Sequence, residues 1–284
     1  MLSLIVAAAL VLPPQKSDAV IGVAAIHIQS GRRVSIRGNE RFPMGSVYKF
    51  PIALAVLRRV DAGTLSLKQE VTIEPKDFAP GWSPLRDNAN QQPITLTVRE
   101  LLRHMVSFSD NTASDALMRL IGGPIPVATR MAELGYGGIH VNRSEKQMAA
   151  DLAQPGGVER YAIDVRDTAT PEDMAALLFA FWRGKDGLSA ESHDLLVHWM
   201  TVTPTGPRRI KAILPPGATL AHKTGTMPGT TNDAGVVVIG NDTVVLVVFT
   251  KKGTSKLELL EADLAAVARA ALDAVWSAVA KPPL

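Results

Sequence analysis

Apolar residues form short continuous runs near both ends of the chain. The first run, residues 20–28, is rich in Val, Ile and Ala, and a turn at Ser30-Gly31 separates it from a second segment, 33–37. Similar runs recur late in the chain, at 219–226, 233–239 and 243–250. Short apolar runs bounded by turn residues are typical of buried strands. The pattern therefore predicts five strands, and two of the connections are short enough to be hairpins.

Helical signals fill the middle of the chain. Thr97 and Glu100 have the spacing of a capping box, and Thr170 followed by a proline marks another helix start. Segment 152–165 contains a Pro-Gly-Gly sequence and is predicted to be a loop. The predicted helices cover 46–60, 97–106, 111–121, 126–134, a segment from 170 onwards, 189–200 and 257–279.

Strands at both ends with helices between them predict an α/β protein of the α+β type. We expect a five-stranded antiparallel sheet flanked by terminal helices, with an all-helical lobe inserted. The sheet domain would comprise residues 1–50 plus 205–284, and the all-α domain residues 51–204. A functional site would then lie in the cleft between the two lobes.

Composition excludes several kinds of function. The 284 residues carry a net charge of only +3, with acids and bases interspersed, which argues against a nucleic-acid partner. The chain has no cysteine, so disulfides and thiolate metal sites are excluded, and its six histidines show no metal-binding spacing. Residues 2–12 form an apolar run too short to span a bilayer. The run is either part of a secretory signal, although no Lys or Arg precedes it, or a first helix packed on the sheet.

Ser46 and Lys49 stand three residues apart at the start of a predicted helix, so the amine and the hydroxyl share one face. A serine becomes a good nucleophile only when a base takes its proton, and the free N–H groups of a helix start favour an oxyanion. An isolated Ser-x-x-Lys is more often a helix cap with a solvated lysine. Here the helix is apolar and would bury Lys49, which favours the catalytic interpretation.

Ser109-Asp110-Asn111 lies between two predicted helices. All three residue types are good helix caps, and a cap is the simplest interpretation of the motif taken alone.

Lys223-Thr224-Gly225-Thr226 lies in one of the strand-like runs. A lysine, two hydroxyls and a glycine along one strand can form an edge that binds a carboxylate, because glycine permits close backbone approach. The plainer interpretation is an edge strand protected by a lysine.

The three motifs, in this order, are typical of class A β-lactamases and penicillin-binding proteins. On these residues the chain resembles a class A serine β-lactamase from about residue 20 to its last helix. The resemblance implies no metal and no organic cofactor. It implies the catalytic residues Ser46, Lys49, Ser109 and Glu145, the substrate-binding residues Asn111, Lys223, Thr224, Gly225, Thr226 and Arg209, and an oxyanion hole formed by the N–H groups of Ser46 and Thr226.

The resemblance also implies an Ω-like loop at about 139–170 that carries the base for deacylation. Segment 144–148 resembles the glutamate segment of the extended-spectrum branch of class A, and this selects Glu145. The run 231–233 also resembles the extended-spectrum branch. The plainer interpretation of Glu145 is an exposed loop acid. Four positions later the chain has Ala149, where the family usually has an asparagine. This departure puts the anchoring of the hydrolytic water in question.

An Arg–Asp pair often closes the neck of this loop in the family. We therefore expect Arg143 to lie within ion-pair distance of Asp167 or Asp164.

The resemblance implies hydrolysis of the β-lactam ring of penicillins and cephalosporins through a serine acyl-enzyme. The alternatives are a D-alanyl-D-alanine peptidase or other penicillin-binding protein, a slowly deacylating relative, a non-hydrolytic β-lactam sensor, and an esterase of the same fold. The expected partner is a small-molecule β-lactam, with no nucleic acid and no membrane span. We expect a monomer, periplasmic or secreted.

Overall fold

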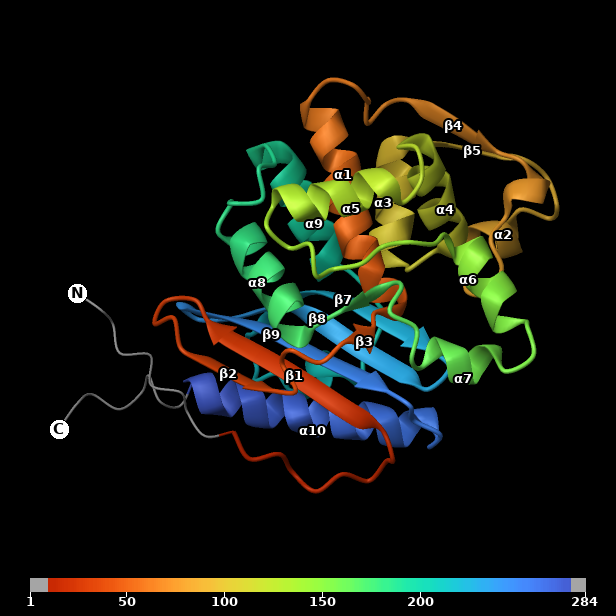
Figure 1. Ribbon diagram of the computed structural model, residues 1–284. Helices are drawn as coiled ribbons and strands as arrows, with labels where there is room; N and C mark the ends of the chain where they lie inside the picture. Colours follow the sequence, from red (N-terminus) through yellow and green to blue (C-terminus); the bar gives the residue numbers. More distant parts are fainter. Residues whose placement is uncertain (1–9, 277–284) are drawn as a thin grey trace.

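A five-stranded antiparallel sheet forms the centre of the molecule, in the order β2-β1-β9-β8-β7 (Figure 1). The computed structural model describes residues 10–276. The strands are β1 (Val20–His27), β2 (Arg33–Ile36), β7 (Thr219–Met227), β8 (Thr230–Ile239) and β9 (Asp242–Lys251). All five come from the two end segments, as the positions of the apolar runs predicted. The domain boundaries themselves remain predictions.

Both faces of the sheet are covered, which explains why the strands are continuous apolar runs and not alternating ones. Successive residues of β1 contribute to two different cores: Ala24 and Ile26 face one, and Val23 and Ala25 face the other. The same alternation holds along β9. Side chains of a strand point to opposite faces in turn, so β1 and β9, which are buried on both sides, are apolar at nearly every position.

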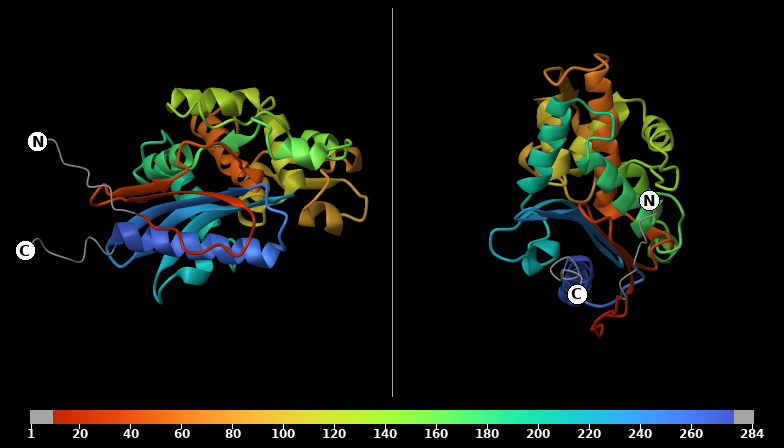
Figure 2. Two further views of the ribbon diagram at one scale, coloured as in Figure 1. Left: turned by 60° about the horizontal axis from the view of Figure 1, so that its bottom comes forward. Right: turned by 90° about the vertical axis from the view of Figure 1, so that its left-hand side faces the viewer.

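One long helix covers one face of the sheet and a group of helices covers the other (Figure 2). The covering helix is α10 (Leu257–Trp276), and α8 (Pro171–Trp182) lies directly on the opposite face. The remaining helices are α1 (Lys49–Asp61), α2 (Pro84–Asn88), α3 (Val98–Ser107), α4 (Asn111–Leu120), α5 (Ile125–Glu133), α6 (Glu145–Leu152), α7 (Gly157–Tyr161) and α9 (Ala190–Thr201).

Short elements complete the helical part. Two small antiparallel ladders join β3 (Phe42–Pro43) to β6 (Thr168–Ala169) and β4 (Glu70–Ile73) to β5 (Ile94–Thr97). The 3-10 turns are η1 (Gly45–Tyr48), η2 (Pro75–Asp77) and η3 (Ile210–Ile213). The capping box expected at Thr97 and Glu100 is present at the start of α3.

Two predicted segments differ from the structure. The helix expected over 46–60 begins as the η1 turn and becomes α-helical only at Lys49, which keeps Pro51 within the first turn, where its missing N–H costs nothing. The loop expected over 152–165 contains α7, of which only Gly157 and Tyr161 are buried. A five-residue helix with two buried positions leaves too little periodicity to be recognised.

Most of the ambiguous N-terminal run lies outside the described residues. Residues 10–19 are described and contain no helix, so of the expected flanking terminal helices only α10 is found in the described part of the chain. Within residues 10–276, no helix is both long enough and apolar enough to cross a membrane.

Candidate active site

Ser46 and Lys49 lie where a single 3-10 turn meets the first long helix. Ser46 belongs to η1 and Lys49 is the first residue of α1. Lys49 Nζ lies 3.1 Å from Ser46 Oγ, as their spacing predicted. The η1 turn packs on β7 and β8 at one edge of the sheet, so this pair lies between the sheet and the helical part.

The ammonium group of Lys49 is fully buried among four oxygen atoms. Besides the bond to Ser46, it donates hydrogen bonds to Ser109 O and Asn111 Oδ1, each at 2.7 Å. Glu145 Oε1 lies 3.0 Å from the same nitrogen as an ion pair. A buried charge is tolerated only where it is paired and hydrogen-bonded. Lys49 therefore holds together three segments that are far apart in the sequence.

The Ser109 motif joins α3 to α4 in a fixed conformation. Ser109 has a φ of 59°, a left-handed conformation that few non-glycine residues adopt. Asp110 caps α4 by accepting the N–H of Ala113 at 2.9 Å, and it accepts a second hydrogen bond from Ser83 Oγ at 3.1 Å. The cap interpretation of this motif is thus confirmed for Asp110. The same cap fixes the turn that directs Ser109 toward Lys49 and β7.

Lys223 of β7 approaches Ser109 from the sheet. Its Nζ donates hydrogen bonds to Ser109 Oγ at 2.8 Å and to Thr224 O at 3.0 Å. Burial lowers the pKa of Lys223 well below its usual range, and the positive charge of Lys49 lowers it further. A lysine with a depressed pKa can exchange a proton with the hydroxyl beside it. The pair can therefore supply a proton to an atom bound next to Ser109.

Glu145 is the first residue of α6, and hydrogen bonds hold the backbone around it. Ser144 and Gln147 form a capping box around it. Asp115 accepts the N–H groups of Glu145 and Lys146 at 2.7 and 3.0 Å. Burial raises the pKa of Asp115 to about 6. Glu145 is only 5% exposed, so it is not the exposed loop acid of the plainer interpretation.

Arg209 is buried beside the Lys223 strand. Its Nη2 donates a hydrogen bond to Thr226 Oγ1 at 2.6 Å, and its Nη1 donates to Gly225 O and Asn232 O. Its Nε lies 3.1 Å from Glu261 Oε1, and the side chain is buried. Arg209 is thus placed to fix the hydroxyl of Thr226.

Gly225 is the point where β7 comes closest to the η1 turn. A Cβ atom added to Gly225 would overlap Met44 O and lie 3.0 Å from Ser46 N. The N–H of Ser46 is therefore next to the strand that carries Thr226. This is the proximity that an oxyanion hole built from these two N–H groups requires.

We expect Gly225→Ala to lower kcat/KM by about 100-fold, because the added methyl group pushes η1 and Ser46 away from β7. The same overlap should cost about 2 kcal/mol of unfolding free energy. Steady-state kinetics and urea unfolding measure the two effects. Gly137→Ala is the matched control, because a Cβ at Gly137 meets no atom within 4 Å. Equal kcat/KM values for Gly225→Ala and Gly137→Ala would contradict the idea that the close packing of β7 on η1 positions Ser46.

Arg143 closes the neck of the loop that carries Glu145, and the expected ion pair is confirmed. Its Nε lies 2.6 Å from Asp167 Oδ2, and its Nη1 lies 3.2 Å from Asp164 Oδ2. Nη1 also lies 2.7 Å from Asp151 Oδ2, a partner that the sequence did not suggest. Arg143 and Asp167 are both buried. The two ends of the loop are therefore joined by a buried, charge-assisted hydrogen bond.

Asp167→Asn should lower the unfolding free energy by about 2 kcal/mol, because an amide NH2 replaces an oxygen that faces the Nε–H of Arg143 or the N–H of Asn142. Asparagine tolerates the φ of 52° at this position, so only the polar contacts change. Urea unfolding measures the loss. Glu159→Gln changes an exposed acid of the same loop and should leave the free energy of unfolding unchanged. An unchanged urea midpoint for Asp167→Asn would show that the Arg143–Asp167 pair makes no net contribution to the free energy of unfolding.

Two residues near the site were given no role from the sequence. Asn232 of β8 donates hydrogen bonds to Pro43 O and Met44 O at 2.7 and 3.0 Å, which fixes the segment leading into η1. Trp82 is 64% exposed and donates its Nε1–H to Phe108 O, beside the Ser109 motif. Asn232 lies in the polar start of β8, between Thr231 and Asp233, so no local contrast marks it. An exposed tryptophan was the available signal for Trp82.

Comparison with known proteins identifies the family. The family model described as "Beta-lactamase enzyme family" matches residues 6–275. The chain is 34% identical over 261 residues to beta-lactamase VEB-1 of Pseudomonas aeruginosa, covering 89% of this chain and 84% of the relative. Its identity to the extended-spectrum beta-lactamase PER-1 of Pseudomonas aeruginosa is also 34% over 261 residues, covering 89% and 82%.

Solved structures agree with these relatives. A beta-lactamase from Chitinophaga pinensis superposes with a TM-score of 0.82 at 34% identity, covering 93% of this chain and 95% of the other. TLA-1 extended-spectrum beta-lactamase gives a TM-score of 0.82 at 30% identity, covering 94% and 95%. The chain therefore belongs to the beta-lactamase enzyme family, as a class A member, and is a serine-dependent hydrolase of cyclic amides.

Proposed function

We propose that this protein hydrolyses penicillins and cephalosporins through an acyl-enzyme on Ser46. The convergence of both lysines on the two serines supports this proposal: Lys49 contacts Ser46 at 3.1 Å, and Lys223 contacts Ser109 at 2.8 Å. Each hydroxyl that must lose or give a proton during acylation has a buried amine beside it.

In the acylation step, Ser46 Oγ attacks the lactam carbonyl carbon as its proton leaves. Either Lys49 first passes a proton to Glu145 across their 3.0 Å contact and, as a neutral amine, takes the proton of Ser46 directly, or Glu145 takes that proton through a water molecule. The N–H groups of Ser46 and Thr226 stabilise the oxyanion, each contributing about 3 kcal/mol to the transition state. When the carbon–nitrogen bond breaks, Ser109 protonates the nitrogen and regains a proton from Lys223.

Substrate binding follows from the side chains around these groups. Lys223, Thr224 and Thr226 of β7 would hold the substrate carboxylate, with Gly225 allowing the close approach of the strand. Arg209 would support this strand through Thr226. The Asn111 amide would bind the side-chain amide of the substrate. In the resting structure its Oδ1 accepts from Lys49 and its Nδ2 donates to Pro80 O, so the group is held in place before substrate arrives.

Deacylation would require Glu145 to activate a water molecule that attacks the ester on Ser46. Glu145 and Ala149 are one turn apart on α6, so their side chains lie on the same face. The methyl group of Ala149 cannot hydrogen-bond a water, so the water would be held by Glu145 and Ser46 alone. This departure is the specific observation that favours the second candidate, a relative that is acylated by β-lactams and releases them slowly.

A D-alanyl-D-alanine peptidase or other penicillin-binding protein is less well supported, because Glu145 is buried against Lys49 where deacylation needs a base. We further propose that the protein acts as a monomer in the periplasm or outside the cell, where β-lactams reach it.

An intact-mass time course with excess benzylpenicillin tests the proposal. Ring opening loses no leaving group, so acylation adds the full mass of the drug. An adduct that appears and then clears as the drug is consumed supports the hydrolase. A persistent adduct supports the slowly deacylating alternative, and no adduct with intact drug contradicts both.

A further inference from the structure

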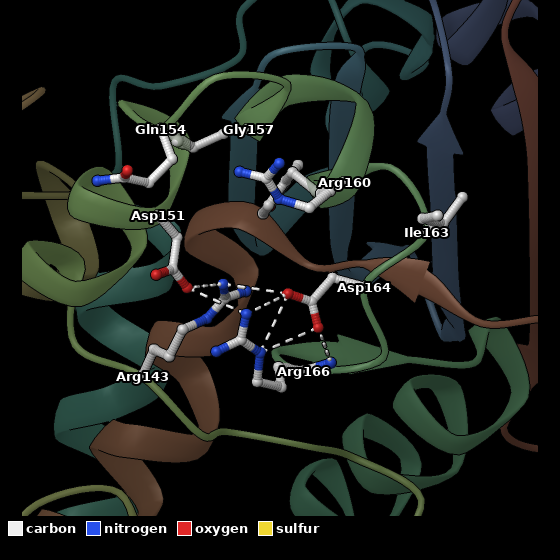
Figure 3. A pocket seen from close by; sticks show the side chains of 10 residues that line it. Arg143, Asp151, Gln154, Gly157, Arg160, Ile163, Asp164 and Arg166 are labelled. Atoms are coloured by element: carbon white, nitrogen blue, oxygen red, sulfur yellow. Dashed lines mark hydrogen bonds and ion pairs between the residues drawn. The ribbon is translucent and has the colours of Figure 1, made fainter.

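Charged side chains at the neck of the Ω-like loop pair with one another (Figure 3). Asp151 and Asp164 each lie within 3.2 Å of both Arg143 Nη1 and Arg166 Nη2. Each of these carboxylates is shared by two guanidinium groups, so the cluster serves to hold the loop together. A buried pair on the sheet is placed differently, because it is built into the strand that carries Lys223.

His222 of β7 and Asp233 of β8 form this pair, and no step of the proposed reaction uses it. His222 Nδ1 lies 2.8 Å from Asp233 Oδ1, and the two side chains are 1% and 0% exposed. His222 directly precedes Lys223, and Asp233 stands opposite Thr224 in the register of the two strands. The pair therefore belongs to the strand that would hold the substrate carboxylate.

A glycine makes room for this pair. Gly235 stands opposite His222, and a Cβ added to it would lie 2.5 Å from His222 Cβ and would overlap Ala221 O. Glycine weakens the interior of a strand and often marks a close approach of two segments. The close packing of β7 and β8 at His222 therefore depends on the missing side chain of Gly235.

Asp233 also fixes the turn that carries Arg209. Its Oδ2 accepts the N–H of Ile210 at 3.2 Å, and Ile210 follows Arg209 and begins η3. From this turn Arg209 reaches β7, where its Nη2 donates to Thr226 Oγ1 at 2.6 Å. A fully buried carboxylate is tolerated only where donors satisfy it. The donors of His222 and Ile210 therefore join Asp233 to the strand and to the turn.

The negative charge of Asp233 acts on Lys223 as well. Burial and the charges of Lys49 and Arg209 lower the pKa of Lys223, whereas the charges of Glu145 and Asp233 raise it. Lys223 must be protonated to attract a carboxylate. Asp233 therefore favours the charge state that the proposed binding role of Lys223 requires.

We propose that Asp233, held by His222, is a positioning residue for recognition of the substrate carboxylate. Asp233 has no exposed surface, so it acts through other residues: it holds the Arg209 turn against Thr226, and its charge favours the ammonium form of Lys223. This inference rests on the proposed function and concerns its carboxylate recognition, which is separate from the base for deacylation.

The test compares benzylpenicillin with its methyl ester, which has the same body but no carboxylate charge. In Asp233→Asn we expect kcat/KM for benzylpenicillin to fall about tenfold and kcat/KM for the ester to stay within about twofold of the wild type. A general loss of structure would lower both values alike. Asp242→Asn is the matched control, because Asp242 pairs with His27 at 3.1 Å where β1 ends and β9 begins.

The pH dependence of kcat/KM gives a second measurement. Asp233→Asn removes a negative charge that raises the pKa of Lys223, so Lys223 should lose its proton at a lower pH. The basic limb of the profile for benzylpenicillin should therefore move to lower pH, whereas Asp242→Asn should keep the wild-type profile. Equal losses for acid and ester in Asp233→Asn, or an unshifted basic limb, would overturn the proposal.

Two variants of His222 cover the case that Asp233→Asn does not fold. His222→Asn keeps an N–H donor on the δ atom that faces Asp233, and His222→Leu removes it. Thermal unfolding checks that both are folded. We expect the ratio of kcat/KM for acid to that for ester to fall in His222→Leu and to remain near the wild-type ratio in His222→Asn. Equal ratios in these two variants would also overturn the proposal.

The wild type separates a failure of this inference from a failure of the proposed function. A wild-type protein that forms no adduct with benzylpenicillin would refute the proposed function, and this inference with it. Wild-type turnover of benzylpenicillin, together with an unchanged acid-to-ester ratio in Asp233→Asn, would refute the role of Asp233 alone.

Discussion

The Glu145→Ala variant should still be acylated by benzylpenicillin, but the acyl-enzyme should persist. Deacylation needs a base that removes a proton from water, and such a base contributes roughly 10²- to 10⁴-fold to a rate. In this protein Glu145 is the buried carboxylate 3.0 Å from Lys49, next to the nucleophile. Because Ala149 offers the water no second anchor, we expect a loss near the upper end of that range. Intact mass after rapid mixing would show a stable adduct with the full mass of the drug.

Two matched variants make this result specific. Glu145→Gln keeps the side-chain volume and should also trap the acyl-enzyme, since an amide cannot act as a base. Glu159→Ala removes an exposed acid from the same loop and should clear the adduct as the wild type does. Rapid clearance by Glu145→Ala would mean that another group activates the water. Loss of acylation in both Glu145 variants would mean instead that Glu145 is needed to take the proton from Ser46.

The sheet could be predicted from the sequence because burial on both faces leaves a plain signal. Neighbouring residues of one strand, such as Val23 and Ala24 of β1, contribute to different cores, so nearly every position of that strand is apolar. The ends of the elements were less predictable. The 3-10 start before Lys49 depends on where Pro51 can be accommodated, and α7 has only two buried residues to mark it.

The candidate site could be recognised as motifs, but most contacts between distant parts of the chain could not be predicted. Ser46 and Lys49 are near in sequence, so helical spacing predicted their contact correctly. Arg209 was placed by resemblance beside the substrate carboxylate, whereas its bonds to Thr226 and Glu261 depend on how α10 packs against the sheet. Asn232 fixes a segment nearly two hundred residues earlier in the chain, and nothing local encodes such a pairing.

Contacts of the Ω-like loop bear on both the stability of the protein and the position of Glu145. Its neck is joined by Arg143 and Asp167, and Glu145, the proposed base, lies only two residues after Arg143. Asp115 holds the backbone of Glu145 from α4. The glutamate is therefore positioned by contacts at its own helix start and at the loop neck, so changes in either place should alter deacylation before they unfold the protein.

Ser46→Ala should abolish both the adduct and the turnover, with a loss on the order of 10⁶ in kcat, as expected when a covalent nucleophile is removed. The fold should survive, because Lys49 keeps its contacts to Ser109 O, Asn111 Oδ1 and Glu145. Urea unfolding would confirm this, and Ser66→Ala, at an exposed turn, provides a control that should retain full activity. The variant keeps the Lys223 strand, so it should still bind benzylpenicillin without reacting, as calorimetry can measure. Turnover comparable to the wild type would remove Ser46 as the nucleophile, and Ser109, beside Lys223, would then be the next serine to test.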